Sequence, residues 1–274
     1  MTTPSLALQP RVAPRLPGAF GTRRSTHLVE RNLVAYRRMW LLLVSGAAEP
    51  VFYLLSLGVG LGKLIPDVTG PAGTPVRYLD FVAPALLATA AMNGALYDAT
   101  FGVFFRLKYE KVYDAVLATP LTPPDIALGE LTWCLIRGGL YAVAFTVVVA
   151  FFGVLHSPWA VLAIPAALLV SLGFAGLGMA MATYMRSWQD FEAVNLLMIP
   201  MFLFSTTFFP LGVYPRGLQL FVEATPLYQG IEIIRGLMLG VVEPGMLLRA
   251  LYLALLALVG LAVAARRFGR LLIA

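Results

Sequence analysis

Long apolar runs separated by short polar segments dominate the pattern of this chain. A helix that crosses the hydrocarbon core of a bilayer needs about 20 mainly apolar residues. Several stretches reach that length, and the turn at Ser157 and Pro158 between two of them is short enough for a helical hairpin. We therefore expect an all-α integral membrane protein with six transmembrane helices, at residues 40–62, 80–105, 131–155, 160–184, 190–210 and 246–265.

Composition supports a membrane protein and argues against a soluble one. Hydrophobic residues make up 59% of the chain and charged residues only 12%, whereas soluble domains carry roughly 25% charged residues. The chain is basic, but its arginines and lysines lie between the apolar runs and form no single basic face. We therefore expect membrane lipids as partners and no nucleic acid.

The distribution of positive charge orients the expected helices. Fourteen of the 20 basic residues fall on one side of the six spans and five on the other, with Arg137 inside a span. Basic residues accumulate on the cytosolic side of membrane proteins. Both termini should therefore be cytosolic, with residues 1–27 as a flexible tail and residues 28–274 as one transmembrane domain.

The segment before the first span has the pattern of an amphipathic helix. Val29, Leu33 and Tyr36 recur at helical spacing, and Arg37 lies on the opposite side. This pattern predicts a helix that lies in the inner membrane interface. The alternative is an ordinary basic anchor for the first span.

The segment after the second span predicts a short cytosolic helix over residues 106–117. Its apolar and aromatic positions share one face, while Arg106 and Glu110 form an i,i+4 pair on another. Such a helix suits either docking to a soluble protein or contact with lipid head groups. The candidate docking residues are Arg106, Lys108, Tyr109, Glu110, Val112, Tyr113 and Val116.

Residues 206–245 are too apolar for a solvated loop, although they fall on the outer side. Prolines divide the stretch into short pieces, which predicts apolar helices that enter the membrane and return without crossing it. The alternative is a seventh, broken span, which would move the carboxyl-terminal arginines outside. The dividing prolines are Pro210, Pro215, Pro226 and Pro244.

Polar and ionisable side chains occur inside the expected spans. Buried ionisable groups are costly in a membrane and face a partner or a wet cavity. They favour either a polar inner vestibule or structural ion pairs that lock helices together, with Glu49 and Arg137 as one candidate pair. The intramembrane polar residues are Glu49, Asn93, Asp98, Arg137 and Glu192.

Motifs for catalysis, metals and ATP are set aside. The stretch 58–63 resembles a phosphate-binding loop, but Leu57 and Leu64 occupy positions that need Gly and Ser or Thr. Gly58 and Gly62 instead permit close helix packing. His27 and His156 have no metal-like neighbours at helical spacing. We expect no catalytic residue, metal site or cofactor in this chain, which disfavours a lipid-modifying membrane enzyme.

The order of segments and several local stretches resemble the permease subunits of type-2 ABC exporters. The resemblance covers residues 28–265 and is closest to the branch of nodulation-type lipo-oligosaccharide and drug exporters. The stretches that carry it are Glu49-Pro50-Val51-Phe52-Tyr53-Leu54, Gly58-Val59-Gly60-Leu61-Gly62, Gly129-Glu130-Leu131-Thr132-Trp133, Phe209-Pro210, Ala224-Thr225-Pro226-Leu227 and Ile231-Glu232-Ile233-Ile234-Arg235.

The resemblance implies partners and roles that composition does not. It implies two cytosolic ATP-binding subunits that hold ATP and Mg²⁺, and a second permease, either a copy of this chain or a different one. Residues 106–117 would be the coupling helix, and 28–38 would touch the same subunit. The complex would lie in the plasma (inner) membrane and export an amphipathic lipid-linked oligosaccharide, lipid or drug, with antibiotic self-protection as the alternative role. The implied outer gate comprises Phe208, Phe209, Pro210, Pro226 and Arg235.

Overall fold

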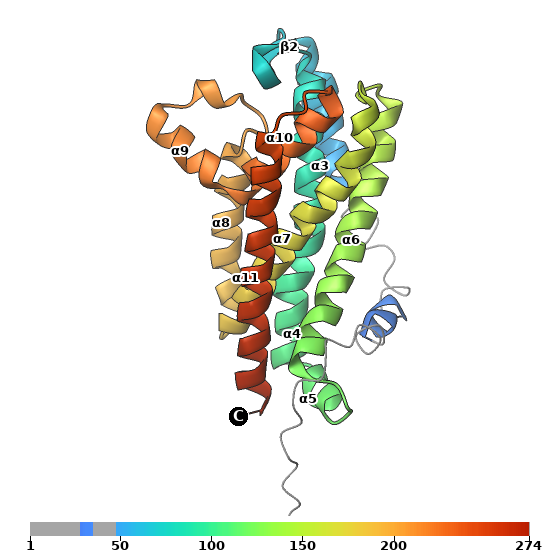
Figure 1. Ribbon diagram of the computed structural model, residues 1–274, viewed down its shortest axis with the longest axis vertical. Helices are drawn as coiled ribbons and strands as arrows, with labels where there is room; N and C mark the ends of the chain where they lie inside the picture. Colours follow the sequence, from blue (N-terminus) through green and yellow to red (C-terminus); the bar gives the residue numbers. More distant parts are fainter. Residues whose placement is uncertain (1–27, 35–47, 274) are drawn as a thin grey trace, which may run out of the picture.

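The computed structural model describes residues 28–34 and 48–273, and most of them are helical (Figure 1). The segment 1–27, expected to form a tail, and the first part of the expected first span lie outside these residues. Residues 28–34 and 48–53 are helical. The further elements are η1 (Leu54–Gly60), η2 (Leu61–Lys63), β1 (Val68–Thr69), η3 (Pro71–Gly73), β2 (Pro75–Val76), α3 (Tyr78–Tyr97), η4 (Asp98–Gly102), α4 (Val103–Lys108), α5 (Val112–Leu117), α6 (Pro123–Phe151), η5 (Pro158–Leu162), α7 (Ala163–Tyr184), η6 (Trp188–Asp190), α8 (Phe191–Phe204), η7 (Leu211–Val213), α9 (Arg216–Ala224), α10 (Pro226–Leu239) and α11 (Gly245–Ile273).

Four helical segments of the described chain are long and apolar enough to cross a membrane. They correspond to the expected second, third, fourth and sixth spans. Their bounds are Tyr78–Lys108, Pro123–Phe151, Pro158–Tyr184 and Gly245–Leu272. The protein is therefore a mostly helical membrane protein, as the apolar runs predict.

The expected fifth span is shorter than the sequence suggests. Its helix, α8, has 14 residues and ends at Phe204, not at residue 210. The chain then turns through Thr206, which has a positive φ of 58°. The Ser205 hydroxyl also lies 2.9 Å from the Thr225 hydroxyl, an interaction that holds this turn against the start of α10. The turn residues Ser205, Thr206 and Thr207 are polar but buried, and the apolar run resumes after them at Phe208.

The two ends of the bundle are distinct (Figure 1). Helix α5 and the carboxyl end of α11 lie at one end, here called the α5 end. The small antiparallel sheet, in which Val68 pairs with Val76, lies at the opposite end, here called the hairpin end. This sheet was not expected from the sequence. The loop 106–117 and the carboxyl terminus thus share one end, as the charge pattern predicts.

Residues 206–245 leave and return to the bundle at the hairpin end. Leu211 and Val213 line a cavity with Thr69 of β1, and Gly240 lies beside Ser157 of the α6–α7 turn. Helices α9 and α10 have nine and 14 residues, or about 14 and 21 Å at the usual rise. Each is short of the roughly 30 Å hydrocarbon core, and prolines begin or precede both helices as expected.

Helices α7 and α11 approach each other most closely at two glycines. A β-carbon on Gly260 would lie 2.3 Å from the carbonyl carbon of Gly176, and one on Gly176 would lie 2.7 Å from the Ala257 oxygen. Small residues permit such backbone contact between membrane helices. This pair, more than the expected Gly58 and Gly62, sets the tightest helix contact, although Gly58 also lies close to Leu79.

We predict that Gly260→Leu separates α7 from α11. The added side chain meets backbone atoms that cannot move aside, and overpacking costs roughly 1–3 kcal/mol or more. Denaturant unfolding of Gly260→Leu in detergent should show this decrease in the free energy of unfolding. Gly269→Leu on the same helix, where a β-carbon meets nothing within 4 Å, should unfold like the parent; equal losses in the two variants would contradict this packing argument.

Candidate functional site

The segment expected to form one docking helix is broken in two. Helix α4 ends at Lys108, and α5 begins at Val112 after Lys111 adopts a left-handed conformation with φ of 49°. Tyr109 is 57% exposed and its ring stacks on Phe105 at 5.0 Å. The expected aromatic stripe along one continuous helix is therefore wrong, because the turn rotates α5 relative to α4.

Tyr113, expected on the docking face, is fully buried in the protein's own core. Its ring lies 5.6 Å from the ring of Phe268 on α11. Burial, and then the nearby Glu130 carboxylate, hold the pKa of the Tyr113 hydroxyl well above its ordinary value, so the group stays neutral. Tyr113 thus fixes α5 to the bundle and presents no surface to a partner.

The other candidate docking residues divide between the surface and the interior. Val112 and Val116 are half-buried on α5, and Arg106 points into the bundle with a side chain only 11% exposed. The exposed residues of this turn are Lys108, Tyr109, Glu110 and Lys111.

Arg106 belongs to a buried ion network centred on Glu130 of α6. The Glu130 carboxylate is fully buried and accepts three contacts. Arg31 Nη2 and Arg106 Nη2 each lie 3.1 Å from it, and Asn32 Nδ2 donates to it at 3.2 Å. One carboxylate therefore joins the helix 28–34, α4 and α6.

Asp98 extends the network into the membrane-spanning part of the chain. Arg106 Nη2 lies 3.4 Å from one of its oxygens and Arg137 Nη1 lies 3.3 Å from the other. Asp98 begins a π-helical turn, η4, a feature often found at functional sites. A β-carbon on Gly102 would lie 2.5 Å from Asp98 Oδ1 and 2.9 Å from Arg106 Nη2, so glycine makes room for this pair.

These contacts correct the expected pairing of Arg137 with Glu49. Asp98 is the carboxylate that binds Arg137, and Glu49 lies in a cavity on a different side of α3. The sequence reasoning also passed over Glu130 as a site residue. Glu130 was named only within the stretch 129–133 that carries the family resemblance, although an acid beside an apolar run was a usable signal of a buried ion pair.

The helix 28–34 contacts the bundle along one of its faces. Leu28 and Asn32 are buried, whereas Leu33 is 59% exposed and Val29 half-buried. The predicted apolar face therefore points away from the protein. The remaining residues assigned to this helix, Tyr36 and Arg37, lie outside the described part of the chain.

A cavity of 510 Å³ lies between residues 48–53, α3 and α8. It brings together three of the predicted intramembrane polar residues, Glu49, Asn93 and Glu192. Asn195 adds a second amide to the wall. The expected polar residues therefore fall into two groups, because Asp98 and Arg137 belong to the ion network instead.

Aromatic pairs lie toward both ends of this cavity. Tyr53 and Phe202 approach each other at 5.8 Å between ring centres, across residues 48–53 and α8. Tyr97 and Phe191 form a second pair at 6.1 Å, between α3 and α8. Tyr53, Phe202 and Tyr97 of these pairs line the same cavity as its polar side chains.

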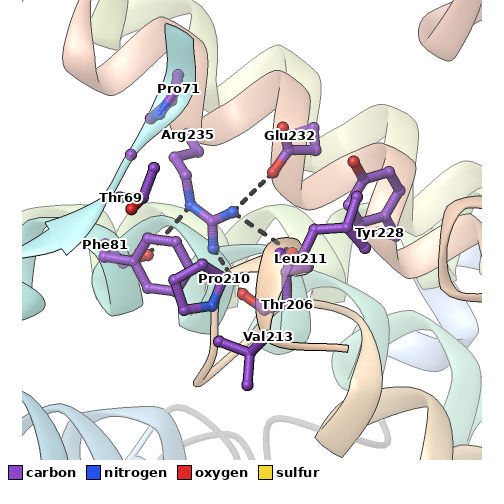
Figure 2. Close-up of a pocket in the computed structure, with 12 residues that line it drawn as sticks. Thr69, Pro71, Phe81, Thr206, Pro210, Leu211, Val213, Tyr228, Glu232 and Arg235 are labelled. Atoms are coloured by element: carbon purple, nitrogen blue, oxygen red, sulfur yellow. Dashed lines mark hydrogen bonds and ion pairs between the residues drawn. The ribbon is translucent and has the colours of Figure 1, made fainter. Parts of the chain in front are cut away.

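Arg235 organises a third site, at the hairpin end (Figure 2). Its guanidinium lies 2.7 Å from Glu232 Oε1, donates to the Thr206 carbonyl at 2.7 Å and to the Phe81 carbonyl at 3.3 Å. It also lies 3.9 Å from the centre of the Phe81 ring. Arg235 is 2% exposed and borders a 450 Å³ cavity, so it ties α10 to α3 and to the turn after α8.

The other expected gate residues are not gathered around Arg235. Pro210 lines the same cavity, but Phe208 packs against Phe202 at 5.2 Å and Phe209 is 54% exposed. Pro226 begins α10 and lines a separate, mostly apolar cavity of 420 Å³ beside α8.

Within residues 28–34 and 48–273, no group of three or more His, Cys, Asp or Glu side chains could hold a metal ion. Cys134 is a buried free thiol. His156 Nε2 lies 3.1 Å from Asp80 Oδ1, which also pairs with Arg77. The arrangement is suited to binding and movement more than to covalent chemistry.

Comparison with known proteins points to one family. Residues 25–239 match the ABC-2 type transporter family. The chain is 33% identical over 212 residues to nodulation protein J of Rhizobium leguminosarum bv. viciae, covering 77% of this chain and 80% of that protein. It is 31% identical over 245 residues to nodulation protein J of Neorhizobium galegae, covering 86% and 91%. It is also 25% identical over 268 residues to a probable doxorubicin resistance ABC transporter permease protein of Mycobacterium tuberculosis, covering 92% and 94%.

Proposed function

This chain belongs to the ABC-2 type transporter family, and we propose that it is the permease subunit of an ATP-driven exporter whose ATP-binding subunits dock at the α5 end. The observation that carries the proposal is the buried ion network, which joins the elements at that end to the spans. ATP and Mg²⁺ are held by two partner chains, and this chain supplies the path.

The docking surface is the exposed turn between α4 and α5. Tyr109 offers a large ring with a polar tip, a combination that suits a protein cleft, and Lys108, Glu110 and Lys111 surround it with charges of both signs. Tyr113 anchors α5 from inside by packing on Phe268. A displacement of the turn by the docked subunit would therefore move α11 as well as α4.

The ion network transmits the same displacement to α6, η4 and the helix 28–34. Arg106 lies on α4, directly before the turn, and binds both Glu130 of α6 and Asp98 of η4. Arg31 and Asn32 connect the helix 28–34 to the same carboxylate. Movement of the docked partner then shifts α3, which forms one wall of the 510 Å³ cavity.

That cavity is proposed as one half of the substrate path, with a second permease covering it. Only Val194 and Met201 are buried among the 14 residues of α8. Glu49 and Glu192, which line the cavity beside this helix, are exposed as well. A carboxylate facing lipid tails is unfavourable, whereas a second permease encloses the acids in a shared, wet path. The second permease is a copy of this chain or a related one.

The layout in the membrane follows from the same reasoning. The helix that includes residues 48–63 and helix α8 complete six spans, α9 and α10 dip into the outer half of the membrane as a gate, and both termini are cytosolic in the plasma (inner) membrane. The substrate is amphipathic: a lipid, a lipid-linked oligosaccharide or a drug. Drug resistance is the second candidate role, since one relative bears that name.

We predict that Tyr109→Ala weakens recovery of the ATP-binding subunit by at least about tenfold, because truncating a central interface aromatic often costs 2 kcal/mol or more. The measurement is co-purification of the two chains from membranes, with ATP hydrolysis of the recovered complex. Folding should be unaffected, since the Tyr109 side chain is exposed.

Trp159→Ala is the matched control, because Trp159 is 54% exposed but precedes α7 at the hairpin end. This variant should recover the ATP-binding subunit normally. A Tyr109→Ala permease that binds its partner and hydrolyses ATP as the parent does would remove the docking surface from the proposal. Failure of the parent chain to recover any ATP-binding subunit would remove the proposal itself.

A further inference from the structure

The cavity between residues 48–53, α3 and α8 holds two acids, and we infer that it binds the positively charged head group of an amphipathic substrate. The inference rests on the proposed function, because it assigns a substrate class to the path of that permease. It follows from the depth, charge and lining of the cavity.

Asn93 gives the depth of the cavity. The continuous helical segment that holds it runs from Tyr78 to Lys108, and Asn93 lies midway along it. At 1.5 Å per residue, this residue is about 22 Å from either end. Asn93 therefore lies close to the middle of the hydrocarbon core, which is about 30 Å thick, whereas Glu192, at the start of α8 beside the Tyr97–Phe191 pair, lies nearer the α5 end.

Among the described residues that line the cavity, Glu49 and Glu192 carry the only charges, and both are negative. Its lining contains no arginine, lysine or histidine of the described chain. The nearby arginines of the described residues are engaged elsewhere, Arg106 and Arg137 with Asp98 of the ion network. Carboxylates that share a largely apolar cavity are unfavourable unless a cation accompanies them, so a cationic ligand supplies the missing partner.

The rest of the lining suits a cation attached to an apolar body. Tyr53 and Tyr97 lie within aromatic pairs toward the two ends of the polar part, and ring faces attract ammonium groups. Leu86, Ile199 and Leu203 provide an apolar wall for a tail. The volume of 510 Å³ falls in the usual range for small-molecule sites, about 300–1,000 Å³.

The space also continues beyond this cavity. Glu49 and Tyr53 line a second, neighbouring cavity of 460 Å³ together with Phe52 and Ser56. A bound molecule can therefore place its charge beside Glu49 while its apolar part extends along either side. An anionic head group is repelled from the same position.

The test uses the permease complex in phosphatidylcholine nanodiscs and two probes with the same tail. Radiolabelled dodecyltrimethylammonium is the cation, and dodecyl maltoside is the neutral, saccharide-headed competitor; binding to empty nanodiscs is subtracted. The cation should bind saturably. Glu49→Gln with Glu192→Gln should weaken its binding at least about tenfold, because losing one partner of a desolvated charge pair costs 2–5 kcal/mol.

Control variants separate charge from folding. Glu192→Asp keeps the charge and should bind the cation within about threefold of the parent, a change below 1 kcal/mol. Glu243→Gln removes an exposed acid between α10 and α11 and should change nothing. The thermal unfolding midpoint of the double Gln variant should match that of the parent, because both carboxylates are exposed on the single permease chain.

Two results would overturn the inference. One is a double Gln variant that binds the cation as the parent does, and the other is dodecyl maltoside displacing the cation as effectively as unlabelled dodecyltrimethylammonium. In both cases the permease should still recover the ATP-binding subunit, and the complex should still hydrolyse ATP. The failure of the inference is thus distinguishable from the failure of the proposed function.

Discussion

Replacing Glu130 by Gln should lower the free energy of unfolding by about 3–5 kcal/mol, the usual cost of removing one partner from a buried ion pair. Glu130 neutralises Arg106 and Arg31 and accepts from Asn32. In the variant, Asp98 alone faces both Arg106 and Arg137. Denaturant unfolding of the purified protein in detergent measures the loss.

The matched control is Glu110→Gln at the same end of the molecule. Glu110 is exposed, and exposed substitutions usually stay within about 0.5 kcal/mol of the parent. A double change, Glu130→Gln with Arg106→Gln, should recover part of the stability, because Arg106 is then no longer left without Glu130, whereas Arg31 still is. Losses that simply add would show that the two side chains are not coupled, and the network would no longer explain how the α5 end moves the spans.

Replacing Arg235 by Ala should also cost about 3–5 kcal/mol, through loss of a buried charge partner and the hole that its side chain leaves. The change removes the donor that Glu232 shares with the carbonyls of Thr206 and Phe81 (Figure 2) and leaves Glu232 with Arg249 alone, at 3.9 Å, among the described residues. Arg235→Lys should lower the free energy of unfolding by more than half of that amount, because a single ammonium cannot reproduce the planar guanidinium that reaches all of these acceptors. The same unfolding measurement applies.

Arg216→Ala serves as the control for this prediction. Arg216 begins α9, and its side chain donates to Gln219 Oε1 at 3.2 Å on the exposed surface. The free energy of unfolding of Arg216→Ala should lie within about 0.5 kcal/mol of the parent value. If Arg235→Lys unfolds at the same denaturant concentration as the parent, then the geometry of the guanidinium does not hold α10 against α3, and charge alone is sufficient there.

The apolar runs were enough to predict the membrane class and most of the long helices. Whether a segment prefers lipid to water depends on the sum of its own side chains and on a length of about 20 residues, so it can be read without knowing its neighbours. The prolines at 215, 226 and 244 likewise act locally, and the helices α9, α10 and α11 begin at or directly after them. The fifth span was overextended because an apolar run resumes at Phe208, just beyond the short polar turn at 205–207 where the helix has already ended.

The positions of the functional side chains depended on the tertiary structure. Helical spacing shows that Tyr109 and Tyr113 share a face only if the helix is continuous, and the left-handed turn at Lys111 breaks that condition. Spacing also leaves open which neighbouring helix a face meets, so it offered Glu49 as the partner of Arg137 and passed over Glu130.

Which charges pair is decided by which helices stand side by side, and that arrangement follows from contacts far apart in the chain. Glu130 binds Arg31 across 99 residues of sequence. Gly102 allows Asp98 and Arg106 to meet only because η4 and α4 turn both side chains to one side. The sequence by itself therefore determined that this protein spans the membrane and how it is divided into helices, while the packing of those helices decided which acids are neutralised and which remain in the cavity.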